Sequence, residues 1–419
     1  MSVSTCLQSG ELQKHTTFYR EFHESSIGSS GVADVKEPPV VRQLLHTRQR
    51  ALLLNKVREP YTLVHDHTIP AISHHGEILV KVLAIGLNPI DWKGPAFNFG
   101  IPSLPWINGR DLVGVVLQIP KDSARLRVGD IVLVPSTDYR DIRKAAFQEY
   151  AVATASNAAR VPSSTSICAS ASLGVAFVAS ALALGVSFGL DFSLITQSPG
   201  PNLALVIKGL QRNEVPTDIQ EECFAPVLAS ERPQRGDWIA IWGASTTTGQ
   251  ITSQLAKLSG LRVICVADIA RHGDRLLQLG ADLLVDRQDP HRAIEVIRGI
   301  TRGKLRYAID LVGSDTATLL QRGLETTGHA HLLGLTGLPK SRDPNIRYHT
   351  VPIKLFHTAP AVGESIVCWL ESLLQSRTLT LPEVVRAEGG LEGINGALDK
   401  LRNGNVSGKR VVVDLRSPQ

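Results

Sequence analysis

Hydrophobic residues occur in short runs through the first part of the chain. Aliphatic and β-branched segments at 51–55, 77–87, 112–119 and 130–135 are each bounded by Gly, Pro or Asp. This pattern is typical of β-strands separated by turns. No helix-length amphipathic run interrupts them before Cys168. The first section is therefore predicted to be mostly β, as a closed or partly closed barrel.

The pattern changes after Gly236. Strand-like runs at 238–243, 262–268, 283–286, 307–313 and 331–337 alternate with segments that have apolar residues at helical spacing. In the first such segment Ile251, Leu255 and Leu258 recur at i, i+4 and i+7, and Gly260 stands at the expected helix end. Strands that alternate with helices predict a doubly wound parallel sheet.

The C-terminal part contains two predicted helices, at 363–375 and 391–401, and a last strand at 410–415. Because that strand has no obvious place in the parallel sheet, we expect it to return to the first domain. The predicted organisation is then a disordered extension at 1–48 and a β domain made of 49–185 and 346–419. Residues 186–345 form the inserted nucleotide domain, with an irregular lobe at about 191–233.

One uncharged segment, from Cys168 to Leu190, is long enough to span a bilayer. It is rich in Ala, Ser and Gly and lacks flanking aromatic belts, which favours a buried helix between domains over a membrane span. No apolar core follows the first methionine, and acidic residues near the start weaken a transit-peptide interpretation. We therefore expect a cytoplasmic protein that does not bind a membrane.

Charge and cysteine content exclude further classes. The formal net charge of the 419-residue chain is +5, but its basic residues are scattered, which does not indicate nucleic-acid binding. The five cysteines, an odd number, are far apart and form no C-x-x-C pair. They predict reduced thiols rather than a disulfide framework or a zinc knuckle.

The turn at 241–250, "IWGASTTTGQ", carries the strongest chemical signal. Gly243 and Gly249 bracket it between a buried strand and a helix, where a tight bend and a close approach are required. The amino terminus of the helix offers N–H groups to an anion. Hydroxyls add further donors to phosphate oxygens, and they belong to Ser245, Thr246, Thr247 and Thr248. The local alternative, a turn that only caps its helix, is equally compatible with these residues.

A second signal follows the next strand, in "VADIARHG". Asp268 at this point would bind a ribose hydroxyl of NAD, whereas Arg271 and His272 would bind the 2′-phosphate of NADP. Ala267 occupies the usual acidic position, so we favour NADPH. The alternative is that Asp268 caps the following helix while Arg271 is solvated.

The order of these segments resembles the medium-chain dehydrogenase/reductase superfamily from about residue 48 to the end. The segments that carry the resemblance are "ILVKVLAIGLNPIDWK", "NGRDLVGVV", "RVGDIVLVP", "FQEYAVA", "GASTTTG", "LGAD" and "VSGKRVVVDL". They are most similar to its zinc-independent branch, which contains quinone oxidoreductases and trans-acting enoyl reductases of fungal polyketide pathways. The resemblance implies a GroES-like barrel with an inserted Rossmann domain.

The departures from the zinc enzymes of that superfamily imply that no metal is bound. Residues 88–93 contain no thiolate, and Arg110 and Asp111 stand where those enzymes have His and Glu. A guanidinium cannot ligate zinc, and no cysteine cluster provides a structural site. Metal-free hydride transfer to an unsaturated thioester or a quinone is the chemistry that this implies.

The resemblance also implies site residues. Near the nicotinamide and its ribose it places Asn88, Pro89, Asp91, Lys93, Thr336 and Gly337. Val406 and Ser407 would close the cofactor site. Arg287 stands where the family often has an adenosine-contacting Tyr, so that contact is in doubt.

Two assignments concern the substrate. Lys93 is our candidate proton donor or oxyanion partner. It follows Asp91 by two positions, which in a strand or extended loop puts both on one side. A solvated salt bridge is the alternative. Gly174, Val175 and Phe177 open the apolar helix and are expected to face the substrate, with plain core packing as the alternative.

Three functions remain open from the sequence. The first is an NADPH-dependent enoyl reductase that acts on an unsaturated carbonyl compound, either free or tethered to a carrier protein. The second is a quinone or alkenal reductase for free small molecules, and the third is a non-catalytic nucleotide-binding protein. A monomer and a homodimer are both compatible with the sequence.

Overall fold

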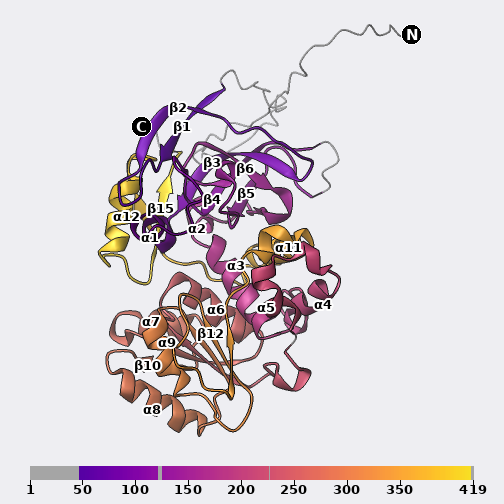
Figure 1. Cartoon of the computed structure of the whole chain (residues 1–419), viewed down its shortest axis with the longest axis vertical. Coiled ribbons are helices and arrows are strands. Elements are labelled where there is room, and N and C mark those ends of the chain that lie inside the picture. The colour runs from indigo at the N-terminus through magenta and orange to yellow at the C-terminus, as the bar shows by residue number, and fades with distance from the viewer. Residues whose placement is uncertain (1–46, 121–124, 226, 417–419) are drawn as a thin grey trace, which may run out of the picture.

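Two β-sheets organise the chain in the computed structural model, which describes residues 47–120, 125–225 and 227–416. The sheets lie at opposite ends of the molecule, with helices between them (Figure 1). The expected disordered extension at 1–48 falls outside the described residues except for its last two, and β1 (Arg48–Leu53) already begins at Arg48.

The first sheet has seven strands and combines distant parts of the sequence. Its members are β3 (Glu77–Gly86), β4 (Asp111–Gln118), β5 (Ile131–Pro135), β6 (Tyr150–Thr154), β7 (Ala159–Arg160), β14 (Val384–Ala387) and β15 (Arg410–Asp414). Their order is β14-β15-β3-β4-β5-β7, and β6 pairs with β3. The C-terminal β15 runs antiparallel to β3, with Val412 opposite Gly86. The predicted return of the last strand to the first domain is confirmed. A smaller sheet pairs β1 with β2 (Thr62–Thr68).

The second sheet is parallel throughout and has six strands. Its members are β8 (Trp238–Trp242), β9 (Arg262–Ala267), β10 (Leu283–Asp286), β11 (Tyr307–Asp310), β12 (Ala330–Gly334) and β13 (Ile346–His349). The strands lie in the order β10-β9-β8-β11-β12-β13. Chain order therefore runs outward from β8 to one edge of the sheet and then from β11 to the other edge. This doubly wound arrangement confirms the predicted class, and in folds of this kind ligands bind where the order reverses.

Four helices accompany these parallel strands. They are α6 (Thr247–Leu258), α7 (Ile269–Gln278), α8 (Pro290–Thr301) and α9 (Ser314–Gln321). The predicted helix from Ile251 to Leu258 is the body of α6, and Gly260 follows it with a φ of +85°. Gly260 therefore adopts the left-handed conformation that the sequence placed there.

The apolar segment after Cys168 lies between the two sheets (Figure 1). It forms α2 (Ile167–Ser170), α3 (Gly174–Leu182) and a π-helical turn at Ala183–Ser187. One hydrophobic cluster runs from Val113 in the first sheet, through Leu182 of α3, to Ile251 of α6. The prediction of a buried helix between domains is confirmed. No helix among the described residues is long and apolar enough to cross a bilayer.

The lobe expected at 191–233 is built from short helical pieces. It contains α4 (Leu203–Lys208) and α5 (Gln220–Phe224), with single 3-10 turns between and beside them. Phe192 stacks on Trp369 of α11 (Pro360–Gln375), with ring centroids 4.4 Å apart. The lobe is thereby fixed to α11, which follows the short α10 (Leu355–Thr358).

Two expectations need correction. A helix, α1 (Pro89–Phe97), interrupts the β section where none was expected. It contains Gly94 and Pro95, which obscure its helical pattern, although Pro89 at its start is a known helix signal. In addition, β13 begins at Ile346 and belongs to the parallel sheet, so that sheet extends past the expected boundary at 345. The predicted C-terminal helix is α12 (Ile394–Arg402).

Candidate functional site

The turn between β8 and α6 has the geometry of a close backbone approach. Gly243 has a φ of +84°, which disfavours any side chain. A Cβ at Gly249 would lie 2.5 Å from the Gly243 carbonyl oxygen and 2.6 Å from the Ala244 Cα. Both glycines are therefore required by the packing of strand, turn and helix.

The hydroxyl groups of this turn divide into two roles. Thr246 is the N-cap of α6, and its Oγ1 accepts a hydrogen bond from the Gly249 N–H at 3.0 Å. The capping alternative is thus correct for Thr246. Within the described part of the chain, Ser245, Thr247 and Thr248 make no side-chain hydrogen bond, and the N–H groups of Thr247 and Thr248 have no acceptor. These groups are partly exposed at the positive end of a 12-residue helix, which suits an anion.

The end of β9 presents one occupied carboxylate and one free cation. Asp268 caps α7 by accepting from the Arg271 N–H at 3.3 Å, and Arg287 lies 3.8 Å from its Oδ2. Arg271 is exposed and has no ion pair among the residues described. His272 Nε2 lies 2.8 Å from Ser407 Oγ, and burial and then Arg271 lower the pKa of His272. The capping alternative for Asp268 is thus correct, while Arg271 is available to an anion.

A C-terminal loop lies against the same turn. Gln250 Nε2 donates to the Ser245 carbonyl at 3.0 Å and to the Gly408 carbonyl at 2.8 Å. Val406 and Ser407 precede Gly408 and are partly buried. The loop at 406–408 therefore lies beside the turn, and its contact with a cofactor stays a prediction.

Two residues further, the chain reaches a buried charge pair that joins the loop to the first sheet. Arg410 Nη2 lies 2.7 Å from Asp111 Oδ2, and Asn88 Nδ2 donates to the same oxygen at 2.9 Å. The other oxygen of Asp111 accepts from the Val175 N–H at 2.6 Å. Burial raises the pKa of Asp111, and Arg410 opposes that shift. This network connects α3, the loop at 406–408 and the start of α1.

Gly174, Val175 and Phe177 open α3 as expected, and two of them, Gly174 and Phe177, are fixed by packing. A Cβ at Gly174 would lie 1.8 Å from Asp111 Oδ1, so only glycine fits there. Phe177 is fully buried and its ring lies 5.6 Å from that of Trp369. The core-packing alternative therefore describes Phe177, while Val175 is partly exposed.

The expected pairing of Asp91 with Lys93 on one side is wrong. Both residues lie on α1, and positions i and i+2 of a helix face different directions. Asp91 is buried, and its Oδ2 accepts from the Asn88 N–H at 2.7 Å, which caps the helix start. Lys93 is partly exposed and its Nζ lies 5.7 Å from the centre of the Trp92 ring. Pro89 is the first residue of α1 and directly follows the N-cap Asn88.

A polar cluster that the sequence assigned no role lies beneath α1. Arg110 is 3% exposed, and its guanidinium stacks on the ring of Tyr139 at 3.8 Å. Asn108 Nδ2 donates to the Tyr61 hydroxyl at 2.7 Å, and Tyr61 donates to the Asp91 carbonyl at 2.6 Å. The sequence signal for this cluster is Arg110 itself, a guanidinium that cannot ligate zinc at a position where the zinc enzymes have a histidine.

The remaining expected contacts lie after β12. Thr336 is exposed and Gly337 follows it. A Cβ at Gly337 would approach the Ser314 N at 3.0 Å, and Ser314 Oγ donates to the Leu338 carbonyl at 2.9 Å. This loop therefore packs on the start of α9, close to the reversal in strand order.

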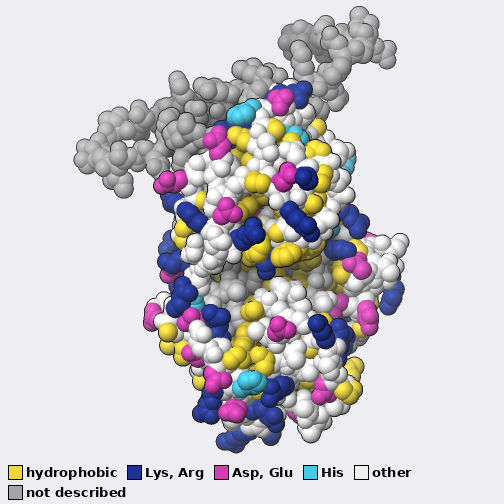
Figure 2. All heavy atoms as spheres, turned by 60° about the vertical axis from the view of Figure 1, so that its left-hand side comes forward, with side chains coloured by type: hydrophobic (Ala, Val, Ile, Leu, Met, Phe, Trp, Pro, Cys, Tyr) yellow, Lys and Arg dark blue, Asp and Glu magenta, His cyan; other side chains and the backbone are white. Residues whose placement is uncertain are grey.

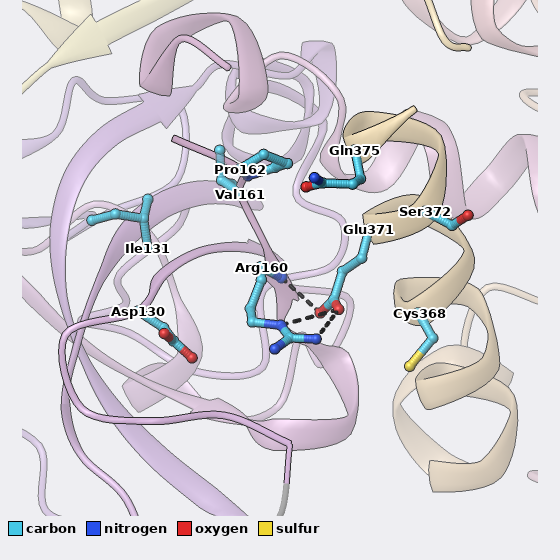
Figure 3. Close-up of a pocket in the computed structure, with 9 residues that line it drawn as sticks. All are labelled: Asp130, Ile131, Arg160, Val161, Pro162, Cys368, Glu371, Ser372 and Gln375. Atoms are coloured by element: carbon cyan, nitrogen blue, oxygen red, sulfur yellow. Dashed lines mark hydrogen bonds and ion pairs between the residues drawn. The ribbon is translucent and has the colours of Figure 1, made fainter. Parts of the chain in front are cut away.

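A cavity lies between β7 and α11, away from the turn between β8 and α6 (Figure 3). Glu371 points across it to Arg160, with 2.9 Å between Glu371 Oε2 and Arg160 Nη2, and it also binds Arg125 at 2.6 Å. The carboxylate of Glu371 is thus paired within the protein. No residue of the turn between β8 and α6 lines this cavity, so we do not place the candidate site there.

The described residues contain no cluster of three His, Cys, Asp or Glu side chains that could hold a metal ion.

A hollow crosses the surface where the two domains meet (Figure 2). The turn after β8, the loop at 406–408 and the first turn of α1 are linked by the hydrogen bonds described above. We take this junction as the candidate site.

Comparisons with known proteins agree with this architecture. The model of the alcohol dehydrogenase GroES-like domain matches residues 74–163, and that of the zinc-binding dehydrogenase matches residues 247–358. A trans-enoyl reductase of Aspergillus sclerotiorum is 28% identical over 372 residues, which cover 84% of this chain and 96% of that protein. Another, from Fusarium heterosporum, is 27% identical over 395 residues, covering 88% and 99%.

Solved structures show the same fold. The quinone oxidoreductase of Escherichia coli, in complex with NADPH, superposes with a TM-score of 0.65 at 17% identity and covers 87% of this chain and 99% of that one. The quinone oxidoreductase of Pseudomonas syringae gives a TM-score of 0.66 at 16% identity, covering 87% and 99%. These structures share the fold of both domains, and the two family models together with the relatives matched over more than four fifths of the chain identify it as an oxidoreductase of the medium-chain dehydrogenase/reductase superfamily.

Proposed function

We propose that the protein is an NADPH-dependent enoyl reductase that reduces the electron-poor C=C bond of an α,β-unsaturated carbonyl compound or thioester. We further propose that it acts in trans on an acyl chain carried by a polyketide synthase. The relatives named trans-enoyl reductase support this substrate class. The observation that carries the proposal is the uncapped pair of N–H groups at Thr247 and Thr248, next to free hydroxyls.

The residues of the turn fit a diphosphate. A helix amino terminus with unpaired N–H groups stabilises an anion through hydrogen bonds and the helix dipole. Thr247, Thr248 and Ser245 add hydroxyl donors, and Gly243 and Gly249 keep the backbone accessible. Asp268 is occupied by its own helix, whereas Arg271 is free to bind a 2′-phosphate. This difference favours NADPH over NADH, with His272 and Arg287 beside it.

The remaining residues would orient the reactants. NADPH, when bound, supplies a hydride to the β-carbon of the substrate while the electron pair of the C=C bond moves toward the carbonyl oxygen. Lys93, a partly exposed cation near Trp92, would donate a proton or a hydrogen bond on the substrate side. Asp91 would position the start of α1 by holding the Asn88 N–H. Thr336 and Gly337 would border the nicotinamide, and Val406 and Ser407 would cover the cofactor.

The test compares hydride acceptors. The purified protein is given NADPH with crotonyl-pantetheine, with a soluble quinone or with neither, and NADPH absorbance is followed. Steady oxidation with the thioester alone supports enoyl reduction. Oxidation with the quinone alone supports the second candidate, which the fold shared with quinone oxidoreductases favours. NADPH binding without oxidation by either acceptor would indicate a non-catalytic protein.

A further inference from the structure

Arg110 is a buried cation without a counter-ion. Its side chain is 3% exposed, and no carboxylate of the described residues lies within ion-pair distance. Its one hydrogen bond among these residues, from Nη2 to Asn108 Oδ1, is 3.5 Å long. The ring of Tyr139 covers one face of the guanidinium. Burial of an unpaired charge is strongly unfavourable, and burial lowers the pKa of Arg110, so folding alone does not explain this residue.

A small cavity adjoins the guanidinium. Polar groups in its lining come from Asp91, Asn108, Arg110 and Tyr139, and apolar ones from Ile90 and Ile101. Asp91 Oδ1 is buried and has no hydrogen-bond partner in the part of the chain that the structure describes. A donor and a second polar group, both buried and incompletely satisfied, thus line one cavity. This combination is expected where a ligand completes the hydrogen bonds.

The cavity is open on the side of the loop after α1. Phe99 is 52% exposed and Gly100 is also exposed, and both belong to the lining. The cavity measures about 10 Å³, which admits one small polar group such as a carbonyl oxygen, so the apolar part of the substrate would lie outside it along the exposed Phe99. On the other side, Arg110 is followed by Asp111, which binds Asn88 and the start of α3. Asp91, which lines the cavity, is close enough to Asp111 and Arg410 for their charges to affect its pKa, so the cavity lies near the Asp111–Arg410 pair.

We propose that Arg110 is a catalytic residue whose guanidinium donates hydrogen bonds to the carbonyl oxygen of the unsaturated substrate and stabilises the negative charge that develops there. This inference rests on the proposed function. A hydride from NADPH would add to the β-carbon, the C=C electron pair would shift to give an enolate oxygen next to Arg110, and the α-carbon would then take a proton from Lys93, the candidate proton donor, as the carbonyl re-forms. A donor fixed in a dry site stabilises such a charge more strongly than water does.

The test compares Arg110→Met and Arg110→Lys with Arg160→Met, a control in the cavity of Figure 3 that removes a similar charge from a half-exposed site. Turnover of crotonyl-pantetheine, NADPH affinity and thermal unfolding are measured for each. Arg110→Met is expected to lower kcat about 100-fold, as removal of an oxyanion donor does. NADPH affinity should stay within about threefold, and the melting temperature should stay equal or rise because a buried charge is removed.

The lysine variant keeps the charge and guards against a folding defect. It should retain more activity than the methionine variant because the cation remains, although its planar fork is lost. The proposal is overturned if Arg110→Met keeps kcat within about threefold, or if it loses stability and NADPH binding together with activity. If the wild-type protein reduces no enoyl thioester, the proposed function itself fails and this inference fails with it.

Discussion

Two buried arginine and aspartate neighbourhoods lie side by side in the first domain and are treated differently. Asp111 accepts hydrogen bonds on both oxygens, from Arg410, Asn88 and the Val175 N–H. Arg110 precedes Asp111 in the sequence but has no carboxylate within ion-pair distance among the described residues. Near it, Asp91 has one buried oxygen without a partner.

The comparison distinguishes charged groups that stabilise the fold by pairing with each other from polar groups that are left available to bind a ligand. The paired group fixes the loop at 406–408 and the start of α3 to the first sheet, so its loss should affect stability. The groups that lack a partner among the described residues are Arg110, which lines the small cavity, Arg271, which is exposed, and the N–H groups of Thr247 and Thr248. Their loss should affect binding or turnover. The same molecule thus offers matched variants for each class.

The largest effect is expected on the paired side. Asp111→Ala would leave Arg410 buried without its counter-ion and remove two further hydrogen bonds. Breaking such a pair costs about 3–5 kcal/mol of unfolding free energy, measured by chemical denaturation. Glu59→Ala, which breaks an exposed pair with Lys56, is the control and should leave the unfolding free energy nearly unchanged, because solvent screens that pair. An equally small loss for Asp111→Ala would remove the distinction.

Thr247→Glu tests the unpaired side. Its carboxylate would repel a diphosphate and weaken NADPH binding about 100-fold, or about 2.7 kcal/mol, in a fluorescence titration. Stability should not fall, because an acidic residue in the first turn of a helix is favourable. Thr247→Gln has the same size without the charge and should bind more tightly than the Glu variant. Unchanged NADPH affinity in Thr247→Glu would contradict the assignment of the turn.

Asp91 gives a pH-dependent test. Burial is the first cause that raises its pKa, to about 7, against about 3.9 in an unfolded chain. Between about pH 4 and 7 the unfolded chain therefore loses this proton more readily than the native protein, and wild-type stability falls as the pH rises. Asp91→Asn removes this term, and its amide oxygen still accepts from the Asn88 N–H.

The Asp91→Asn variant should therefore gain stability relative to wild type as the pH rises from 5 to 8, by on the order of 2 kcal/mol. Chemical denaturation at both pH values measures the difference. A difference between the two proteins that is the same at pH 5 and pH 8 would show that the buried carboxyl is not held in its neutral form.

The smallest effect is expected at Arg271. Arg271→Ala should weaken NADPH binding about 10-fold, or about 1.4 kcal/mol, and leave NADH binding unchanged, because only NADPH carries the 2′-phosphate. Arg298→Ala on α8, also exposed, is the control and should change neither affinity. Equal losses for both nucleotides would place the phosphate contact elsewhere.

Most of the architecture was accessible from the sequence because burial leaves a periodic pattern. The runs that became β3, β4, β5 and β8 to β12 are continuous aliphatic segments between turn residues. The helix α1 could not be predicted, because Gly94 and Pro95 disturb its hydrophobic pattern and the helix is only nine residues long. The strand β13 carries Arg347 and two polar aromatic residues and resembles no buried strand, yet the parallel sheet accepts it at its edge.

The site was accessible only where backbone geometry dominates. Gly243 and Gly249 are recognisable because a tight turn excludes side chains. The partners of Asp111 were not, since Arg410 is 299 residues away in the chain and only the fold joins them. The expected extended loop at Asp91 and Lys93 is a helix, so the two side chains point in different directions and not to one side as predicted. Arg110 shows the reverse case, because its significance lies in the partner that it lacks.

The most direct test of the whole account is a crystal structure of the protein with NADPH and a saturated acyl-pantetheine. The account predicts pyrophosphate oxygens within hydrogen-bond distance of the N–H groups of Thr247 and Thr248, and the acyl carbonyl oxygen within hydrogen-bond distance of the Arg110 guanidinium. A nucleotide bound away from this turn, or a turn filled by the protein's own side chains, would contradict it.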